Sequence, residues 1–275
     1  MLASSNRGGV NMMATQNNWN SYEFRDEVTG VILRSRINRL ASSSSDEAPV
    51  VILITGDGPK GSKSMSWANL PPRLEMVGIR SFLFDFAGLG YSDGTRRSLT
   101  CDAGSSNLRS AYRFLRSTIC GDDVRMGAVA SSFGANILLC SPDIANELHA
   151  IVLKSPAGYL PEAYANEVGR DEFRRWARIG YSEVNGYDFQ VFRSALAANA
   201  YLAASRINSP CLITHGTADE IVPFAQSVVL SGLLGGDVEF VPFEDGGHGY
   251  SEEGAWERMA SMYVEWLHRR LRIDV

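Results

Sequence analysis

The sequence predicts an α/β protein with a mostly parallel eight-stranded sheet, helices on both faces of that sheet and a short helical cap. Short apolar runs, several of them rich in β-branched residues, alternate with stretches long enough for helices, which is typical of a parallel sheet with helical crossovers. These runs span residues 50–55, 81–86, 124–130, 150–155, 211–215 and 238–243. Two earlier strand-like segments, 21–27 and 31–37, leave no room for a helix between them and predict an antiparallel hairpin at one sheet edge.

Two further patterns predict the last helix and the cap. Apolar residues recur every three or four positions from Trp256 to Leu271, and basic residues gather at the end of this segment, where cations suit the helix dipole. Residues 157–205 contain no run of the buried-strand type, but Phe173 and Trp176 belong to a narrow apolar stripe of helical spacing. We therefore expect a helical cap insertion at about 157–205, between two strands and well placed to act as a lid.

The composition is that of an ordinary globular protein, with 275 residues, 45% hydrophobic and 21% charged, and a net charge of −5. It lacks the basic domain typical of nucleic-acid binding, and no run of about 18 apolar residues is available to span a membrane. Residues 1–18 are polar and predict a disordered tail before a folded domain over 19–275. The four cysteines show neither CxxC nor zinc-ligand spacing, which favours a reduced, cytoplasmic protein. The sequence leaves the oligomeric state open.

Two adjacent serines in VASSFGAN, residues 129–136, raise the question of a nucleophile. On a sharp strand-to-helix turn the residues two before and two after the nucleophile must be small. Ser132 has Ala130 and Gly134 at these positions, whereas Ser131 has a valine and a phenylalanine. Ser132 therefore fits a nucleophile elbow, although alanine replaces the usual first glycine. The alternative is a serine that only caps the following helix.

A serine nucleophile needs a base, and the base needs an orienting carboxylate. Asp219 follows one predicted strand and His248 follows the next, so both loops should meet Ser132 at one edge of a parallel sheet. The chain order of serine, aspartate and histidine is that of the α/β-hydrolase arrangement. His215 ends a strand and is expected to brace the Asp219 loop, and Asp245 is expected to shape the histidine loop.

With these residues in place, the chain from about residue 20 to 272 resembles the α/β-hydrolase superfamily. DFAGLGYSDG at 85–94 is similar to the glycine-rich loop after the fourth strand of that superfamily, and HGTADEIVP at 215–223 is similar to its acid loop. The short insertion after LKSPA is similar to the cap of the serine aminopeptidase-like group, which includes cinnamoyl and feruloyl esterases and monoacylglycerol lipases. We expect the Asp85 loop to be structural, because its glycines supply tight turns.

The resemblance also implies an oxyanion hole of two backbone N–H groups. One donor is expected at Phe133, directly after the nucleophile. The other is expected in the loop after the third predicted strand, at Asp57, with Gly58 as the neighbouring candidate. Relatives usually carry His-Gly where this chain has Thr55 and Gly56, and we expect Thr55 to take over the support of the loop.

The carboxylate of Asp57 is unusual beside a developing oxyanion, which it would oppose. Either its side chain turns away and binds loop amides, or it faces the substrate. Lys60 and Lys63 follow closely and are candidates to neutralise it, or to receive a polar or anionic acyl group at the mouth of the site. The alternative is that these residues only form the scaffold of the loop.

Together these residues predict a serine hydrolase that cleaves small carboxylic esters through an acyl-enzyme, with no metal or organic cofactor. One alternative is a thioesterase or acyltransferase, with an acyl carrier as its partner. Another is a ligand-binding protein on the same fold that has lost catalysis. Aromatic residues of the cap would suit an aromatic acyl group, or simply pack the cap onto the main domain.

Overall fold

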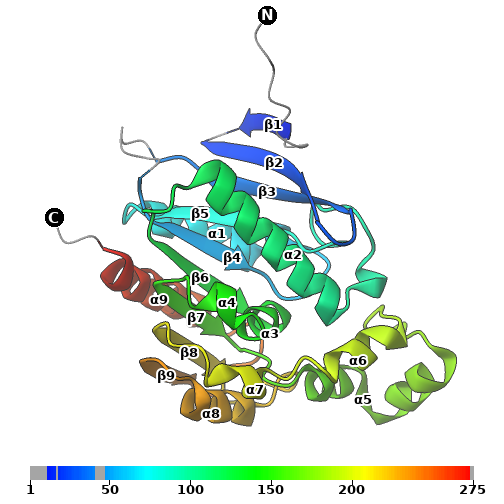
Figure 1. Ribbon diagram of the computed structural model, residues 1–275. Helices are drawn as coiled ribbons and strands as arrows, with labels where there is room; N and C mark the ends of the chain where they lie inside the picture. The colour runs from blue at the N-terminus through cyan, green and yellow to red at the C-terminus, as the bar shows by residue number, and fades with distance from the viewer. Residues whose placement is uncertain (1–10, 17, 41–46, 273–275) are drawn as a thin grey trace, which may run out of the picture.

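A computed structural model describes residues 11–16, 18–40 and 47–272 of the chain. In this part of the chain, nine strands form one sheet in the order β1-β2-β3-β5-β4-β6-β7-β8-β9 (Figure 1). The strands are β1 (Asn11–Gln16), β2 (Trp19–Arg25), β3 (Ile32–Asn38), β4 (Val50–Ile54), β5 (Arg80–Phe84), β6 (Met126–Ser131), β7 (Ala150–Lys154), β8 (Cys211–Gly216) and β9 (Val238–Phe243). Neighbours from β5 to β9 pair in parallel, and β1, β2 and β3 are antiparallel.

All eight expected strands are present, and β2 and β3 form the expected hairpin at one side of the sheet. The sheet differs from the prediction by its additional edge strand, β1, which lies within the segment expected as a tail. That expectation was wrong for residues 11–16, whereas residues 1–10 and 17 lie outside the described residues. The composition of the segment cannot reveal that the free edge of β2 offers unpaired backbone N–H and C=O groups to an added strand.

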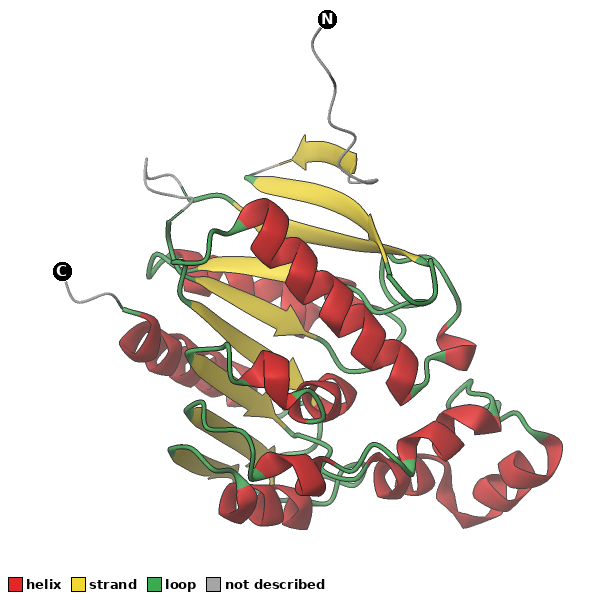
Figure 2. Ribbon diagram, viewed as in Figure 1, coloured by secondary structure: helices red, strands yellow, loops and turns green. Residues whose placement is uncertain are grey.

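Helices cover both faces of the sheet, as Figure 2 shows. They are α1 (Met65–Glu75), α2 (Cys101–Phe114), α3 (Ser132–Leu139), α4 (Pro142–Ala145), α5 (Leu160–Ile179), α6 (Phe189–Ala195), α7 (Ala200–Ala204), α8 (Phe224–Leu233) and α9 (Ala255–Leu271). Short helical turns occur at η1 (Gly61–Lys63), η2 (Arg96–Ser98) and η3 (Leu115–Ile119). Helices α1 and α9 pack on one face, and α2 and α3 pack on the other.

The core is divided by the sheet into two apolar layers. Successive side chains of a strand point to opposite faces, so β4 contributes Val50, Ile52 and Ile54 to one layer and Val51 and Leu53 to the other. Because helices cover both layers, β4 is buried along its whole length. This arrangement explains why the parallel strands appear in the sequence as continuous apolar runs.

The cap consists of the helices between β7 and β8. Helix α5 is kinked at Gly169, where φ is 73°, and ends at Gly180 in the left-handed conformation. Trp176 is fully buried, and its indole N–H donates to the Tyr187 carbonyl at 2.9 Å. Its ring packs edge-on against aromatic rings of the same cap, so much of the aromatic content forms the core of the cap.

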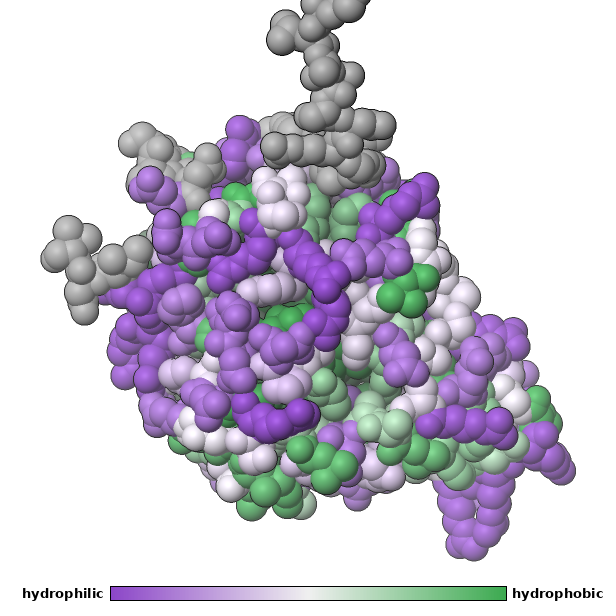
Figure 3. Space-filling view, in the orientation of Figure 1, coloured by the Kyte–Doolittle hydropathy of each residue, from purple (hydrophilic) through white to green (hydrophobic). Residues whose placement is uncertain are grey.

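On the face of the molecule seen in Figure 3, polar residues surround the region of α2, and apolar residues gather at the lower edge over α8. Val228, Val229 and Leu233 are the exposed apolar residues of α8. Among the described residues, no helix combines the length and the apolar character that crossing a membrane requires.

Candidate active site

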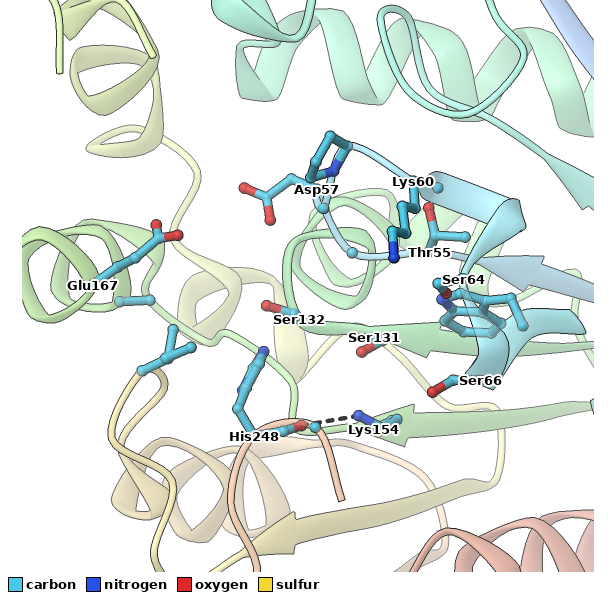
Figure 4. Close-up of a pocket in the computed structure, with 18 of the residues that line it drawn as sticks. Thr55, Asp57, Lys60, Ser64, Ser66, Ser131, Ser132, Lys154, Glu167 and His248 are labelled. Carbon is cyan, nitrogen blue, oxygen red and sulfur yellow. Dashed lines mark hydrogen bonds between the residues drawn. The ribbon is translucent and has the colours of Figure 1, made fainter. Parts of the chain in front are cut away.

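A pocket of about 520 Å³ lies at the carboxyl ends of the parallel strands, beneath the cap. The arrowheads of the strands in Figure 2 point toward this side. The loops after β4 and β9 contribute Asp57 and His248 to its wall, the start of α3 contributes Ser132, and α5 contributes Glu167 (Figure 4). Tyr164 of α5 lines the pocket as well. Parallel pairing explains the convergence, because it brings every strand end to the same edge.

Ser132 stands at the junction between β6 and α3, with a φ of 51° that is rare outside glycine. A Cβ atom at Gly134 would lie 2.2 Å from the carbonyl oxygen of Thr55, so only glycine fits there. Ala130 is fully buried in the strand before the turn. Gly134 is therefore required because the end of strand β4 packs directly against it. The spacing of residues in the sequence did not reveal this close contact.

His248 and Asp219 meet below the serine. Nδ1 of His248 lies 2.7 Å from Oδ2 of Asp219. In Figure 4 the other ring nitrogen of His248 points into the pocket toward Ser132. The Ser132 hydroxyl forms no hydrogen bond with any residue that the structure describes, and such contacts often tighten only when substrate binds. The structure thus brings all three expected residues to one pocket.

The carboxylate of Asp219 is held from two sides. Its Oδ2 also lies 3.0 Å from Nε2 of the fully buried His215, and its Oδ1 accepts two backbone N–H groups of its own turn. Burial opposes ionisation of Asp219, but hydrogen bonds from His215 and His248 outweigh it and hold the pKa of this carboxyl well below its ordinary value. Asp219 is therefore an anion at neutral pH, as an orienting carboxylate must be.

His215 acts as the expected brace. Nε2 faces both the Asp219 carboxylate and the Val222 carbonyl at 2.9 Å, and because both accept hydrogen bonds, Nε2 carries the proton. Nδ1 lies 2.6 Å from the hydroxyl of Ser227. The ring thereby ties β8, the acid turn and α8 together.

The loop after β4 passes close to the nucleophile. A Cβ atom added to Gly56 would lie 3.5 Å from Cβ of Ser132. The backbone N–H of Asp57 has no acceptor among the described residues. Phe133 is the second residue of α3, a position where a backbone N–H has no partner within the helix. Asp57 lines the same pocket as Ser132, and the N–H of Phe133 directly follows the nucleophile, so both stay predicted oxyanion donors.

The Asp57 side chain was expected either to bind loop amides or to face the substrate, and its main contact is a third one. It does not bind loop amides but reaches the cap, where Oδ2 accepts a hydrogen bond from the Tyr187 hydroxyl at 2.7 Å. The carbonyl of Asp57 accepts from Nε of Arg96 at 2.6 Å, and the Arg96 guanidinium stacks over the Tyr187 ring. Figure 4 shows the same carboxylate turned toward Glu167 across the pocket.

The expected role of Thr55 was wrong, because its buried hydroxyl has no hydrogen-bond partner in the described part of the chain. Asp85 supports the loop instead, as its carboxylate accepts from the backbone N–H of Ser62 at 2.6 Å and from the Ser62 hydroxyl at 2.9 Å. The same carboxylate accepts the N–H of Tyr91 at 3.0 Å. The structural role expected for the Asp85 loop is confirmed. Asp85 also holds Ser62, in the segment that follows the candidate oxyanion loop.

The two lysines of this segment point in different directions. Lys63 donates to the Gly90 carbonyl at 2.6 Å and covers the ring of Tyr91, so it does not neutralise Asp57 or reach the pocket wall. Lys60 lines the pocket, and its ammonium points inward in Figure 4.

Two residues of the pocket wall were missed in the sequence. Lys154 ends β7 and donates from Nζ to the carbonyl of His248 at 2.9 Å. Glu167 faces the pocket from α5; burial and the charge of Asp57 raise the pKa of its carboxyl to about 7, against the effect of Arg96. In the sequence, Lys154 could have been noticed as a lysine at the end of an apolar strand. No pattern in the sequence pointed to Glu167.

Comparison with solved structures identifies the architecture. The esterase Est1E of Butyrivibrio proteoclasticus with bound ferulic acid superposes with a TM-score of 0.74, at 18% identity, over 90% of this chain and 99% of that one. An esterase of Pyrococcus furiosus gives 0.71 at 18% identity, over 92% and 93% of the two chains. Alpha/beta hydrolase domain-containing protein 10 from mouse gives 0.70 at 16% identity, over 95% and 99%. The chain has the α/β-hydrolase fold.

Within the α/β-hydrolase fold, sequence comparison adds little. No protein-family profile matches the chain. The uncharacterized protein YfhR of Salmonella typhi is 25% identical over 208 residues, which is 74% of this chain but only 65% of the length of that relative. The expected fold class is thus confirmed, and the reaction must be argued from the site itself.

Proposed function

We propose that the protein is a serine hydrolase that cleaves carboxylic esters through an acyl-enzyme. The observation that carries this proposal is the position of Ser132, strained at a strand-to-helix turn and facing a histidine whose other nitrogen is bound to the buried Asp219. Strained backbone at such a turn exposes a nucleophile. The esterases among the similar structures support the reaction class.

The reaction follows from the roles of these groups. His248 takes the proton from the Ser132 hydroxyl while its oxygen attacks the ester carbonyl, and Asp219 holds the ring and stabilises the imidazolium. The N–H groups of Asp57 and Phe133 then stabilise the negative charge on the former carbonyl oxygen. His248 returns the proton to the departing alcohol, and water repeats the sequence to release the acid.

The same acyl-enzyme would serve a thioesterase or an acyltransferase, which differ in the leaving group and in the acceptor. An acyl carrier stays a candidate partner in that case. The free thiols of Cys101, Cys140 and Cys211 support a reducing, cytoplasmic environment.

The test is hydrolysis of p-nitrophenyl esters from acetate to dodecanoate by the wild type and by Ser132→Ala. We expect turnover by the wild type, with an optimum that sizes the acyl site, and a loss of about four orders of magnitude or more in the variant. Ester turnover that survives in a folded Ser132→Ala protein would contradict the proposal.

If no ester is hydrolysed, acyl thioesters with and without alcohol and amine acceptors distinguish the alternatives. Binding of a ligand that is equally tight in both proteins, with no turnover of any acyl compound, would instead indicate a binding protein.

A further inference from the structure

The two sides of the pocket carry different sets of charged groups. Asp57 and Glu167 lie on the side of the cap, whereas Lys60 and Lys154 lie on the other side of Ser132, as Figure 4 shows. Arg96 also lines the pocket and accompanies Asp57 and Glu167, so positive charge is in excess only at the two lysines. The hydroxyl of Ser131 lies between the two ammonium groups in this view. A substrate bound at Ser132 therefore meets a different electrostatic environment on each side of the scissile bond.

Lys154 is a buried cation without a carboxylate partner. Only 7% of the residue is exposed, and its Nζ forms no ion pair with a described residue. One of its three donors binds the His248 carbonyl, and the ammonium lies 4.5 Å from the centre of the Tyr250 ring. Burial lowers the pKa of Lys154 to about 8, so it is still mostly protonated at neutral pH. A buried charge is costly unless an opposite charge meets it.

The nearest carboxylates are committed elsewhere. Asp219 and Glu252 are the acids that raise the pKa of Lys154 against the effect of burial. Asp219 is bound to His215 and His248, and Glu252 accepts the backbone N–H of Gly247 at 2.9 Å. Neither carboxylate lies on the pocket side of Lys154, since neither belongs to the pocket wall.

Lys60 and Ser131 supply further donors on the same wall. The Lys60 ammonium forms no hydrogen bond or ion pair with a described residue, whereas the Lys63 ammonium donates to the Gly90 carbonyl. Ser131 is buried to all but 7%, lines the pocket and has no side-chain hydrogen bond to a described residue. Two ammonium groups and a hydroxyl thus face one space with donors unused.

We propose that Lys60, Lys154 and Ser131 form a carboxylate-binding subsite, and that the protein prefers esters that carry a free carboxylate, such as half-esters of dicarboxylic acids. This inference rests on the proposed function and names its substrate class. Charge-assisted hydrogen bonds from two ammonium groups suit a carboxylate. On the side of the cap, Arg96 offsets the charge of Asp57 and Glu167, so the excess of positive charge at Lys60 and Lys154 both attracts and aligns the substrate carboxylate.

The kinetic test compares three esters of similar size. They are p-nitrophenyl butyrate, the p-nitrophenyl half-ester of glutaric acid, and the butyrate ester of a nitrohydroxybenzoic acid, which carries its carboxylate on the leaving group. We expect kcat/KM of the wild type to favour one of the two anionic esters over the neutral one, and the favoured ester assigns the subsite to the acyl or the leaving-group side.

Lys60→Met should lower the ratio of anionic to neutral kcat/KM by about tenfold, mainly through KM, because a hydrogen bond to a charged group is lost. Lys60→Arg should keep most of the preference. Lys63 is on the same loop but is bound to Gly90, so Lys63→Met should leave kcat/KM unchanged for both the anionic and the neutral esters. A wild type without any anionic preference, or equal losses on all three esters in Lys60→Met, would overturn the subsite.

A binding test separates this inference from the proposed reaction. Monomethyl glutarate is titrated into Ser132→Ala by calorimetry, and we expect binding that is weakened by Lys60→Met and by Lys154→Met, but not by Lys63→Met. Absent or lysine-independent binding overturns the subsite even if neutral esters are hydrolysed. Lysine-dependent binding without any ester turnover upholds the subsite and rejects the esterase reaction.

Discussion

The carboxylate of Asp57 and the hydroxyl of Tyr187 are hydrogen-bonded at 2.7 Å, although the two residues are 130 positions apart. This contact joins the candidate oxyanion loop to the cap. Burial and the charge of Asp57 keep the pKa of Tyr187 well above its ordinary value, so the phenol is the donor and the carboxylate the acceptor. The bond also turns the negative charge of Asp57 toward the cap.

Tyr187→Phe should therefore lower kcat/KM on p-nitrophenyl butyrate by about tenfold, a fraction of the loss that follows removal of an oxyanion donor. Without the bond, the loop and its Asp57 N–H are less well fixed, and the carboxylate is free to turn toward the oxyanion. Tyr181→Phe is the matched control, because that cap hydroxyl has no hydrogen-bond partner among the described residues. Equal activity of Tyr187→Phe and the control would show that the contact does not position the loop.

The two histidines bound to Asp219 should have separable effects. His248→Ala should abolish turnover, by about four orders of magnitude or more, with little loss of stability because the ring lines a pocket. His215→Ala should lower the free energy of unfolding by about 3 kcal/mol, since it removes a fully buried ring with three polar contacts. Urea unfolding and ester kinetics on both variants measure the two effects. A stable His215→Ala protein would contradict the role of the brace.

Asp85→Ala should destabilise the protein by about 3 kcal/mol, because its buried carboxylate accepts three hydrogen bonds that hold two loops together. Activity should fall as well, since the segment after the oxyanion loop loses its support. Asp102→Ala, an exposed change on α2, is the control. Chemical unfolding of the two variants tests the prediction, and similar midpoints would reject it.

Glu167 should make stability depend on pH. Its pKa is raised from 4.5 to about 7, so near pH 6 the folded protein holds a proton that the unfolded chain has lost. The contribution of the Glu167 carboxyl to the free energy of unfolding is therefore lost as the pH rises from about 4.5 through about 7. Glu167→Gln should flatten the fall in melting temperature between about pH 5 and pH 8, whereas Glu265→Gln, exposed on α9, should not. Parallel curves for wild type and Glu167→Gln would refute this.

The positions of Ser132, Asp219 and His248 could be predicted because each depends on a local pattern next to a strand. Small neighbours select Ser132 over Ser131, and parallel strands bring the loops after them to one edge. The order of residues along the chain is enough for this argument. Side-chain partners are a different matter. Asp85 supports the loop in place of Thr55, and Lys63 contacts Gly90 rather than Asp57 or the mouth of the site.

By itself, the sequence determined the fold class, the strands of the parallel sheet and the three residues that meet at its edge. These depend on periodicity and chain order, which act over a few residues at a time. Only the tertiary structure decided that Tyr187 holds Asp57, that Lys154 is buried beside His248, and that Lys60 and Lys154 line the same pocket. The physical reason is that charge and hydrogen-bond partners depend on which distant segments pack together, and packing is a property of the whole chain.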